Sequence, residues 1–219
     1  WRPDKDMGKS LYKVSSSGLV EQLCIRLGML LFTRIVASLG VVDYASHVIA
    51  MNLYGITYNL CDGFGVGAAA LVGQSLGAMR KDLAMIYGWV SQRIALIFSL
   101  SAAIIIYLAR GPIVRIFSQS PGVLEVTSRI LLILIIISVV QTVQVVLSSS
   151  LRGAGATSYV AKQALVGLGI MRPLSAYIFT YCLGFGVIGA WLGILADQGI
   201  RSLLLIKRFN DSKWTEIQL

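Results

Sequence analysis

The amino-acid sequence predicts an all-α integral membrane protein with six transmembrane helices, on three observations. Its 219 residues are 56% hydrophobic and 13% charged, with a mean hydropathy of +0.77, whereas soluble domains carry about 25% charged residues. Six apolar stretches approach the roughly 20 residues that a helix needs to cross a bilayer. The 22 glycines are scattered through these stretches, as transmembrane helices tolerate.

The first three predicted spans differ in how apolar they are. They cover residues 16–39, 46–73 and 83–108. The first is the least apolar, because it contains Glu21, Arg26 and Arg34. The second contains Asp62 within a long hydrophobic run and then becomes a ladder of small residues up to residue 78. Small residues let membrane helices approach closely. The third begins with Tyr87 and Trp89, which suit a membrane interface.

The last three predicted spans cover residues 124–147, 159–182 and 186–206. The fourth contains the run LLILIIISVV, the fifth is broken by Pro173, and the sixth carries Asp197 and Arg201. Short connections separate all six, so neighbouring spans are expected to be antiparallel. Around them, residues 1–15 are predicted to be a linker, residues 16–207 a transmembrane lobe, and residues 208–219 a polar tail.

The distribution of basic residues predicts that both ends of the chain lie in the cytoplasm. An even number of spans places both ends on one side, and that side is the richer in lysine and arginine. Its basic residues are Arg2, Lys5, Lys9, Lys13, Arg80, Lys81, Arg152, Lys162, Lys207, Arg208 and Lys213. The opposite turns offer mainly Arg110 and Arg115. The expected location is the plasma membrane, with several passes.

Several classes of function are not expected. The net charge of +9 could suggest nucleic acid, but the basic residues lie between apolar spans and form no stripe. Cys24, Cys61 and Cys182 are far apart, without the spacing of a metal site. The sequence contains no phosphate-binding loop and no motif of a hydrolase or metalloprotease. We therefore expect no enzyme, metal, cofactor or nucleic-acid partner, and an ion gradient as the energy source.

Three segments resemble the C-terminal half of multidrug and toxic compound extrusion (MATE) transporters. They are DGFGVGAAALVGQSLGA after the second span, SSSLRGAGAT after the fourth, and GAWLGILADQGIRSLLLIKRFNDSKW at the end. The residues of the two loop motifs are Gly73, Gln74, Gly77, Leu151, Arg152, Gly153 and Gly155. The resemblance covers nearly the whole chain. It implies one lobe of a twelve-helix, two-lobe exporter of cationic or amphipathic compounds, driven by protons or sodium, whose N-terminal six-helix lobe is missing from this chain.

Two departures from the family pattern bear on the coupling ion. The family's second motif usually ends in GDT, but Ala156 replaces its aspartate. The sodium-coupled branch carries an acid about ten positions before Leu151, where this chain has Gln141. The resemblance therefore implies proton rather than sodium coupling, through an acid of the other lobe.

Membrane acids are the first candidates for coupling, since charges inside a bilayer are usually kept for function. Glu21 matches a family position where a carboxylate faces the cavity; alternatively it pairs with Arg26 or reaches the interface. Asp62 stands where many family members have proline. It is either a coupling or gating acid or the fixed partner of an arginine on another helix, such as Arg93.

The second group of candidate site residues consists of uncharged polar residues that occur in pairs on one helical face. Gln141 and Gln144 share a helical face and either line an aqueous cavity or bond between helices. Tyr54 and Tyr58 share a face that either meets the cavity or packs.

Other polar residues favour structural roles. Asp197 and Arg201, four residues apart, are in register for a helix salt bridge. Arg172, just before Pro173, is expected to bind carbonyls or a nearby acid. His47 is expected at the interface as a polar cap.

Two alternatives to a multidrug exporter remain open. One is a lipid-linked oligosaccharide flippase of the wider superfamily, which a strongly basic cavity would support. The other is a non-transporting membrane scaffold that assembles through its small-residue faces.

Overall fold

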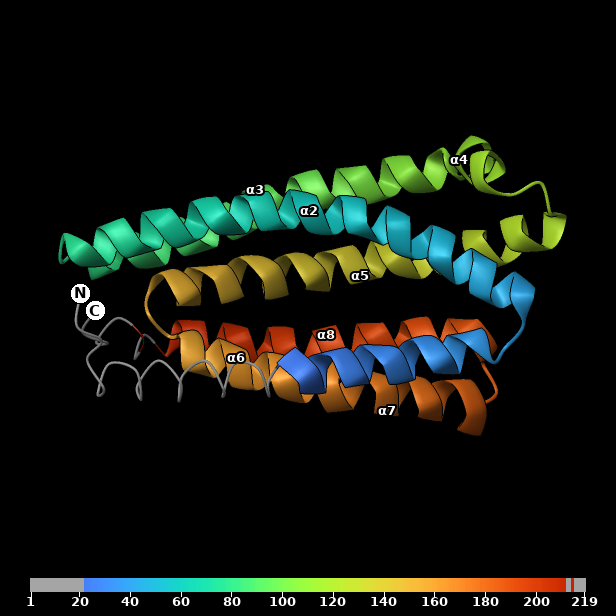
Figure 1. Ribbon diagram of the computed structural model, residues 1–219. Helices are drawn as coiled ribbons and strands as arrows, with labels where there is room; N and C mark the ends of the chain where they lie inside the picture. Colours follow the sequence, from blue (N-terminus) through green and yellow to red (C-terminus); the bar gives the residue numbers. More distant parts are fainter. Residues whose placement is uncertain (1–21, 212–213, 215–219) are drawn as a thin grey trace, which may run out of the picture.

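The computed structural model describes residues 22–211 and 214, and over this part of the chain the protein is helical, with short turns and no strand (Figure 1). The first helix runs over residues 22–37. It is followed by α2 (Val41–Gly77), α3 (Lys81–Leu108), α4 (Arg110–Phe117) and α5 (Pro121–Gly153). Next come α6 (Thr157–Val166), the π-helix η1 (Gly167–Met171), α7 (Arg172–Tyr177), the π-helix η2 (Ile178–Cys182) and α8 (Gly186–Asn210).

Within the described residues, four helices are long and apolar enough to cross a membrane. They are Lys81–Leu108, Pro121–Gly153, the continuous rod Thr157–Cys182, and Gly186–Asn210. Each falls on a predicted span. Helix α2 has 37 residues and is therefore about 55 Å long, well beyond the roughly 30 Å hydrocarbon core of a bilayer. The predicted second span, 46–73, lies within this helix, which continues beyond it at both ends. The first predicted span begins outside the described residues.

The short connection between the third and fourth predicted spans contains a helix. Helix α4 occupies Arg110–Phe117. Pro112 is tolerated there because it lies in the first turn, where backbone N–H groups have no helical acceptor. Val114 is fully buried in the main hydrophobic core, and the Arg110 guanidinium lies 4.4 Å from the centre of the Tyr107 ring. Burial of one apolar face stabilises a segment too short to be helical alone.

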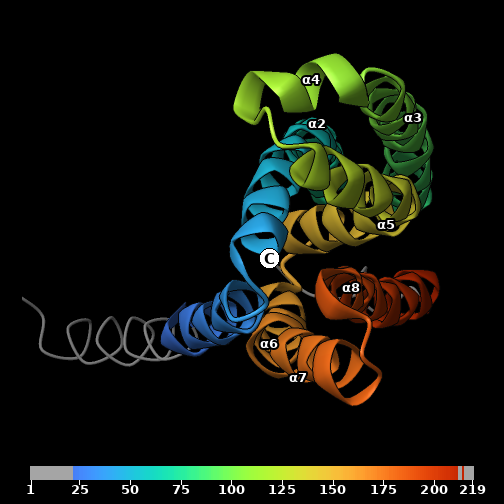
Figure 2. The same cartoon turned by 90° about the vertical axis from the view of Figure 1, so that its right-hand side faces the viewer.

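The helices form two groups that α5 and α8 join. Helices α2, α3 and α5 pack on one another, while α8 packs on α7 and η2 and, across the molecule, on α5 (Figures 1 and 2). Figure 2 shows the first helix on the side of α6 and α7. Gly28 of this helix makes the contact close, because a Cβ there would lie 2.4 Å from the carbonyl oxygen of Leu168.

The α2–α5 contact is made by small residues at every fourth position. A Cβ on Gly153 would lie 2.3 Å from the carbonyl oxygen of Ala69. A Cβ on Gly73 would lie 3.1 Å from the carbonyl oxygen of Gly153, and one on Gly65 would lie 2.9 Å from Ser149 Oγ. The ladder of small residues predicted from the sequence therefore brings two helix backbones together, as such ladders do in membranes.

The two loop motifs end their helices with the same backbone turn. After α5, Ala156 donates to the carbonyl of Leu151 and Gly155 to that of Arg152, with Gly155 at φ +81°. After α2, Arg80 donates to the carbonyl of Ser75 and Met79 to that of Leu76. Both patterns are Schellman closures, which need a left-handed residue. Glycine meets this need after α5, whereas Met79 takes φ +58° after α2.

Candidate functional site

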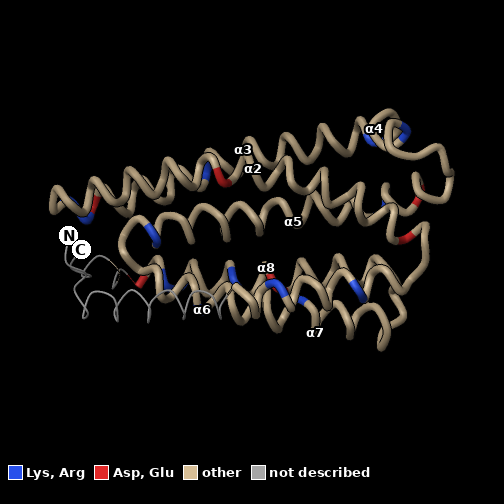
Figure 3. Tube along the Cα trace, in the orientation of Figure 1, with Lys and Arg blue, Asp and Glu red and all other residues tan. Residues whose placement is uncertain are grey.

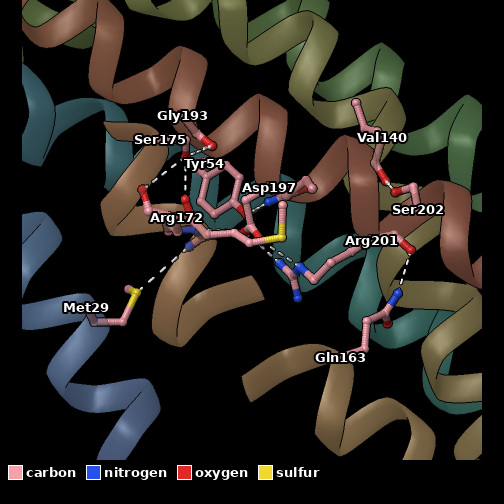
Figure 4. A network of polar contacts seen from close by, with 12 residues as sticks. Met29, Tyr54, Val140, Gln163, Arg172, Ser175, Gly193, Asp197, Arg201 and Ser202 are labelled. Carbon is pink, nitrogen blue, oxygen red and sulfur yellow. Dashed lines mark hydrogen bonds and ion pairs between the residues drawn. The ribbon is translucent and has the colours of Figure 1, made fainter. Parts of the chain in front are cut away.

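A buried network of three charged side chains lies between α7 and α8 (Figure 4). Asp197 accepts from Arg201, with Nε 3.0 Å from Oδ1 and Nη2 3.1 Å from Oδ2. Asp197 Oδ2 also accepts from Arg172, with Nε at 3.1 Å and Nη2 at 3.0 Å. The side chain of Asp197 is 0% exposed, and those of the two arginines are 5–6% exposed. One carboxylate thus serves two guanidinium groups, and the network carries a net charge of +1.

One stripe of α8 explains how the network forms. Gly189, Gly193, Asp197 and Arg201 follow one another at intervals of four residues and so lie on one face. The glycines bring the neighbouring helix close, because a Cβ on Gly193 would lie 2.7 Å from the backbone nitrogen of Ala176. Farther along the stripe, Gly167 of η1 leaves room for the charges, since a Cβ there would lie 2.3 Å from Arg201 Cδ.

The network also reaches α2 and the first helix. Gln198, next to Asp197, donates from Nε2 to the Tyr54 hydroxyl at 2.5 Å, and Figure 4 shows Tyr54 beside Arg172 and Asp197. Arg172 Nη1 lies 3.9 Å from Met29 Sδ on the first helix. Side chains from four helical segments therefore meet at one buried charged centre.

The helix that supplies Arg172 is irregular on both sides of it. Pro173 has no N–H, and its ring disturbs the preceding turn. The π-helices η1 and η2 flank α7, which contains Pro173. Such wide turns are rare and are frequent at functional sites. Ser175 fills part of the disturbed hydrogen-bonding pattern, with its hydroxyl 2.6 Å from the carbonyl oxygen of Met171 and 3.2 Å from that of Gly193.

The structure brings together four of the residues singled out in the sequence, namely Tyr54, Arg172, Asp197 and Arg201. Tyr58, which was expected to share a helical face with Tyr54, is 40% exposed. Its ring centre lies 6.4 Å from that of Tyr54. It therefore lies at the edge of the same aromatic face of α2.

The two glutamines of α5 differ from each other. Gln141 is fully buried, and neither its amide nitrogen nor its amide oxygen has a hydrogen-bond partner among the described residues. Gln144 is half-buried. A buried amide without partners is destabilising unless water or a ligand satisfies it, so Gln141 marks a polar position inside the bundle.

Asp62, one of the two acids proposed for coupling, does not belong to this centre. Asp62 and Arg93 are both exposed, and they form no ion pair within 4.0 Å in the part of the chain that the structure describes. Arg26 is exposed as well. Glu21 lies outside the described residues, so the pairing expected between Glu21 and Arg26 stays a prediction.

Sequence reasoning missed Met29, Gln198 and Gly167 as neighbours of the network, and it did not anticipate the burial of His47. His47 is 5% exposed and lies among rings, 5.6 Å from Phe32 and 5.8 Å from Trp191 between centres. Gln198 had a usable signal, since it adjoins Asp197 on the same helix. Met29 and Gly167 had none, because only the helix crossings bring them near.

A membrane-depth groove of about 570 Å³ lies between the first helix and α7. Its lining includes Arg34, Pro173, Tyr177 and Tyr181. Tyr177 is 52% exposed.

Sequence comparison relates this chain to known transporters. The MatE family model matches residues 19–178. A probable multidrug resistance protein NorM of Thermotoga maritima is 27% identical over 209 residues, which cover 94% of this chain and 44% of that protein. The chain thus spans about half the length of the curated relatives that it matches.

Structure comparison shows the same fold. The bent form of the Vibrio cholerae MATE transporter VcmN superposes with a TM-score of 0.84 at 18% identity, over 96% of this chain and 48% of that one. A superfamily transporter from Pyrococcus furiosus, whose reversed pocket polarity is described as suggesting a different function, gives a TM-score of 0.77 at 23% identity, over 85% of this chain and 41% of that one.

Proposed function

Because this chain belongs to the MatE family of multidrug and toxic compound extrusion transporters, we propose that it forms one six-helix half of a secondary active multidrug exporter. This exporter exchanges cationic or amphipathic compounds for protons or sodium by alternating access. The missing partner is a second six-helix lobe, and the protein lies in the plasma membrane with both ends of this chain in the cytoplasm.

The observation that carries the proposal is the buried centre formed by Arg172, Asp197 and Arg201 beside an interrupted helix. Charged side chains inside a membrane bundle mark pathways for ions or substrates. Secondary carriers place their sites at helices whose regular hydrogen bonding is broken. Here the break at Pro173 is adjacent to Arg172, so a movement of α7 would act directly on the charged centre.

Proton coupling is the preferred form of the proposal. The position that is acidic in the sodium-coupled branch is the neutral, buried Gln141. In the part of the chain that the structure describes, the acids outside the network are exposed or lie near helix ends. This half therefore offers no carboxylate cluster for sodium among its described residues. In proteoliposomes of the full-length protein, we expect substrate uptake to follow an imposed pH gradient and to persist when sodium is replaced by potassium.

An efflux assay tests the proposal and its acids. The full-length protein would be expressed in a drug-sensitive host, and accumulation of a fluorescent cation would be measured with Glu21→Gln, Asp62→Asn and the double variant. We expect the wild-type protein to lower accumulation and the Glu21→Gln variant to lose most of that effect. Efflux that survives in all three variants would remove both acids from the mechanism, while no efflux in any variant or in the wild type would favour the scaffold alternative.

One observation favours a second candidate, a flippase or exporter of anionic lipid-linked substrates. The buried centre has a net charge of +1, with two guanidinium groups sharing one carboxylate. A positive cavity would attract a pyrophosphate lipid rather than a cationic drug. Competition separates the candidates, because a pyrophosphate lipid should inhibit uptake of the cation only if both enter the same cavity.

A further inference from the structure

A second groove lies between α6 and α8, next to the charged centre, because Arg201 and Gly167 are among the residues that line it. Its volume is about 370 Å³, within the range of small-molecule sites. Its walls are mainly apolar and include Val166, Ile200 and Leu204, each more than 40% exposed. The groove thus opens on the outer surface of the bundle, where aliphatic side chains face the bilayer.

Two cations stand at one end of this groove. Lys162 lines it and is exposed. Arg208 lies beside it, with its guanidinium 5.4 Å from the centre of the Tyr159 ring, and Tyr159 also lines the groove. Neither cation forms an ion pair within 4.0 Å among the described residues. Arg208 Nε is buried and has no hydrogen-bond partner there.

The charge around the groove is one-sided. Residues 157–171 contain no acid, and residues 186–210 contain only Asp197, which is buried and already paired with two arginines. The nearest further acid in sequence is Asp211, which follows α8 and makes no ion pair with Arg208. Among the described residues, neither Lys162 nor Arg208 therefore has an ion-pair partner.

The two cations lie near the ends of their helices, at one end of the bundle. Lys162 is the sixth residue of α6, about 8 Å from its start, and Arg208 is two residues from the end of α8. Both are close to the turn between α5 and α6, at the end of the bundle that also carries the α2–α3 turn (Figures 1 and 3). Val166 and Ile200 lie deeper, along the hydrocarbon.

We infer that this groove binds one anionic phospholipid, whose phosphate contacts Lys162 and Arg208 and whose acyl chain lies along Val166, Ile200 and Leu204. Basic pockets between transmembrane helices recognise anionic headgroups in this way, and the apolar walls suit a chain that is already in the bilayer. The inference needs only that the protein is embedded in a membrane, and it is independent of what the protein transports.

Native mass spectrometry of the full-length protein in detergent tests the inference. The protein would be stripped of lipid and then titrated with phosphatidylglycerol or with phosphatidylcholine of the same acyl chains. We expect one phosphatidylglycerol molecule to be retained in preference to phosphatidylcholine. Each basic contact near an anionic headgroup is worth about a fivefold change in affinity, so the double variant Lys162→Gln, Arg208→Gln should retain phosphatidylglycerol roughly 25-fold more weakly.

Three further variants make the test specific. Lys162→Gln alone, at an exposed position, should weaken retention about fivefold and serves if the Arg208 change disturbs folding. Val166→Trp should fill the groove and weaken retention without changing any charge. Lys81→Gln removes a lysine at the same end of the bundle but on α3, and it should leave retention within about twofold of wild type.

Three results would overturn the inference. The first is equal retention of the two lipids by the wild-type protein. The second is a loss of retention in Lys81→Gln as large as that in Lys162→Gln, which would mean general attraction to the surface. The third is wild-type retention in Val166→Trp, which would mean that no acyl chain enters the groove.

Discussion

The α2–α5 pair is held by small residues where Gly65–Gly73 meets Ser149–Gly153, whereas the α7–α8 pair changes from glycines to charges halfway along one stripe. Gly65, Gly73 and Gly153 meet backbone or small side chains across the first interface. Along the second, Gly193 meets the backbone of Ala176, and one turn later Asp197 meets Arg172.

The two interfaces differ in what the contact does: the α2–α5 contact holds helices together, whereas the α7–α8 contact also carries charged groups. Lipid provides no hydrophobic drive for helices to associate, so close backbone contact between small residues supplies dispersion energy instead. Charges do not add stability easily, since desolvation can exceed their attraction. We therefore attribute the charged centre between α7 and α8, as part of the proposed function, to the movement of ions or substrates rather than to packing.

The largest expected effect is at the charged centre. Asp197→Asn would leave two buried guanidinium groups without a counter-charge, and breaking a buried pair in this way costs about 3–5 kcal/mol. Thermal stability of the purified full-length protein, followed by size-exclusion chromatography, measures it. Arg201→Gln is the matched variant: it leaves one carboxylate and one guanidinium in balance, so its loss should be smaller. Equal losses would mean that charge balance does not control this interface.

A smaller loss is expected when a side chain enters the α2–α5 contact. In Gly153→Ala the new Cβ would meet the carbonyl oxygen of Ala69 at 2.3 Å, so the helices must separate, and overpacking of this kind costs about 1–3 kcal/mol. Gly77→Ala is the control, since nothing lies within 4 Å of its Cβ position. The same melting assay should show a loss only for Gly153→Ala.

Gly193→Ala tests the glycine half of the second interface. Its Cβ would lie 2.7 Å from the backbone nitrogen of Ala176, and a loss of about 1–2 kcal/mol is expected. A shift of α7 also stretches the contact between Arg172 and Asp197. The efflux rate should therefore fall by more than the small loss of stability accounts for. Gly199→Ala, on the same helix with open space around it, should change neither. A fall in stability without a fall in efflux would separate the glycines from the charged centre.

The smallest effect is expected at Asp62. It is exposed and has no ion pair among the described residues, so Asp62→Asn should change stability by no more than about 0.5 kcal/mol. Arg93→Gln, the matched change on α3, should be equally neutral. A large loss of stability in either variant would show that the two side chains form a pair in the membrane.

Much of the fold followed from local patterns, and the errors have physical causes. Pro121, Pro173 and the glycine-rich turns punctuate the apolar runs, so the spans could be placed from the sequence. The ends of α2 could not, because the helix continues beyond the apolar residues at both ends and hydropathy does not mark its termini. Helix α4 was missed because its stability depends on burying Val114 against distant helices.

Candidate residues of the site were predicted less completely. Asp197 and Arg201 could be paired from their spacing alone, and Arg172 was expected to bind an acid. The identity of that acid depends on a contact across 25 residues of chain. The neighbour Tyr54 is 144 residues from Gln198, and no periodicity in either segment indicates that they meet.

By itself, the sequence determined an all-α membrane protein of the MatE family, the small-residue face of α2, the break at Pro173 and the spacing of Asp197 and Arg201. Helical periodicity fixes which side chains share a face, and bilayer thickness fixes how long an apolar run must be. Only the tertiary structure decided which faces meet: it buried Gln141 and His47, left Asp62 on the surface, and placed two arginines on one carboxylate. In an apolar solvent both sides of a helix can be hydrophobic, so helix partners are chosen by the close fit of backbones, which composition does not reveal.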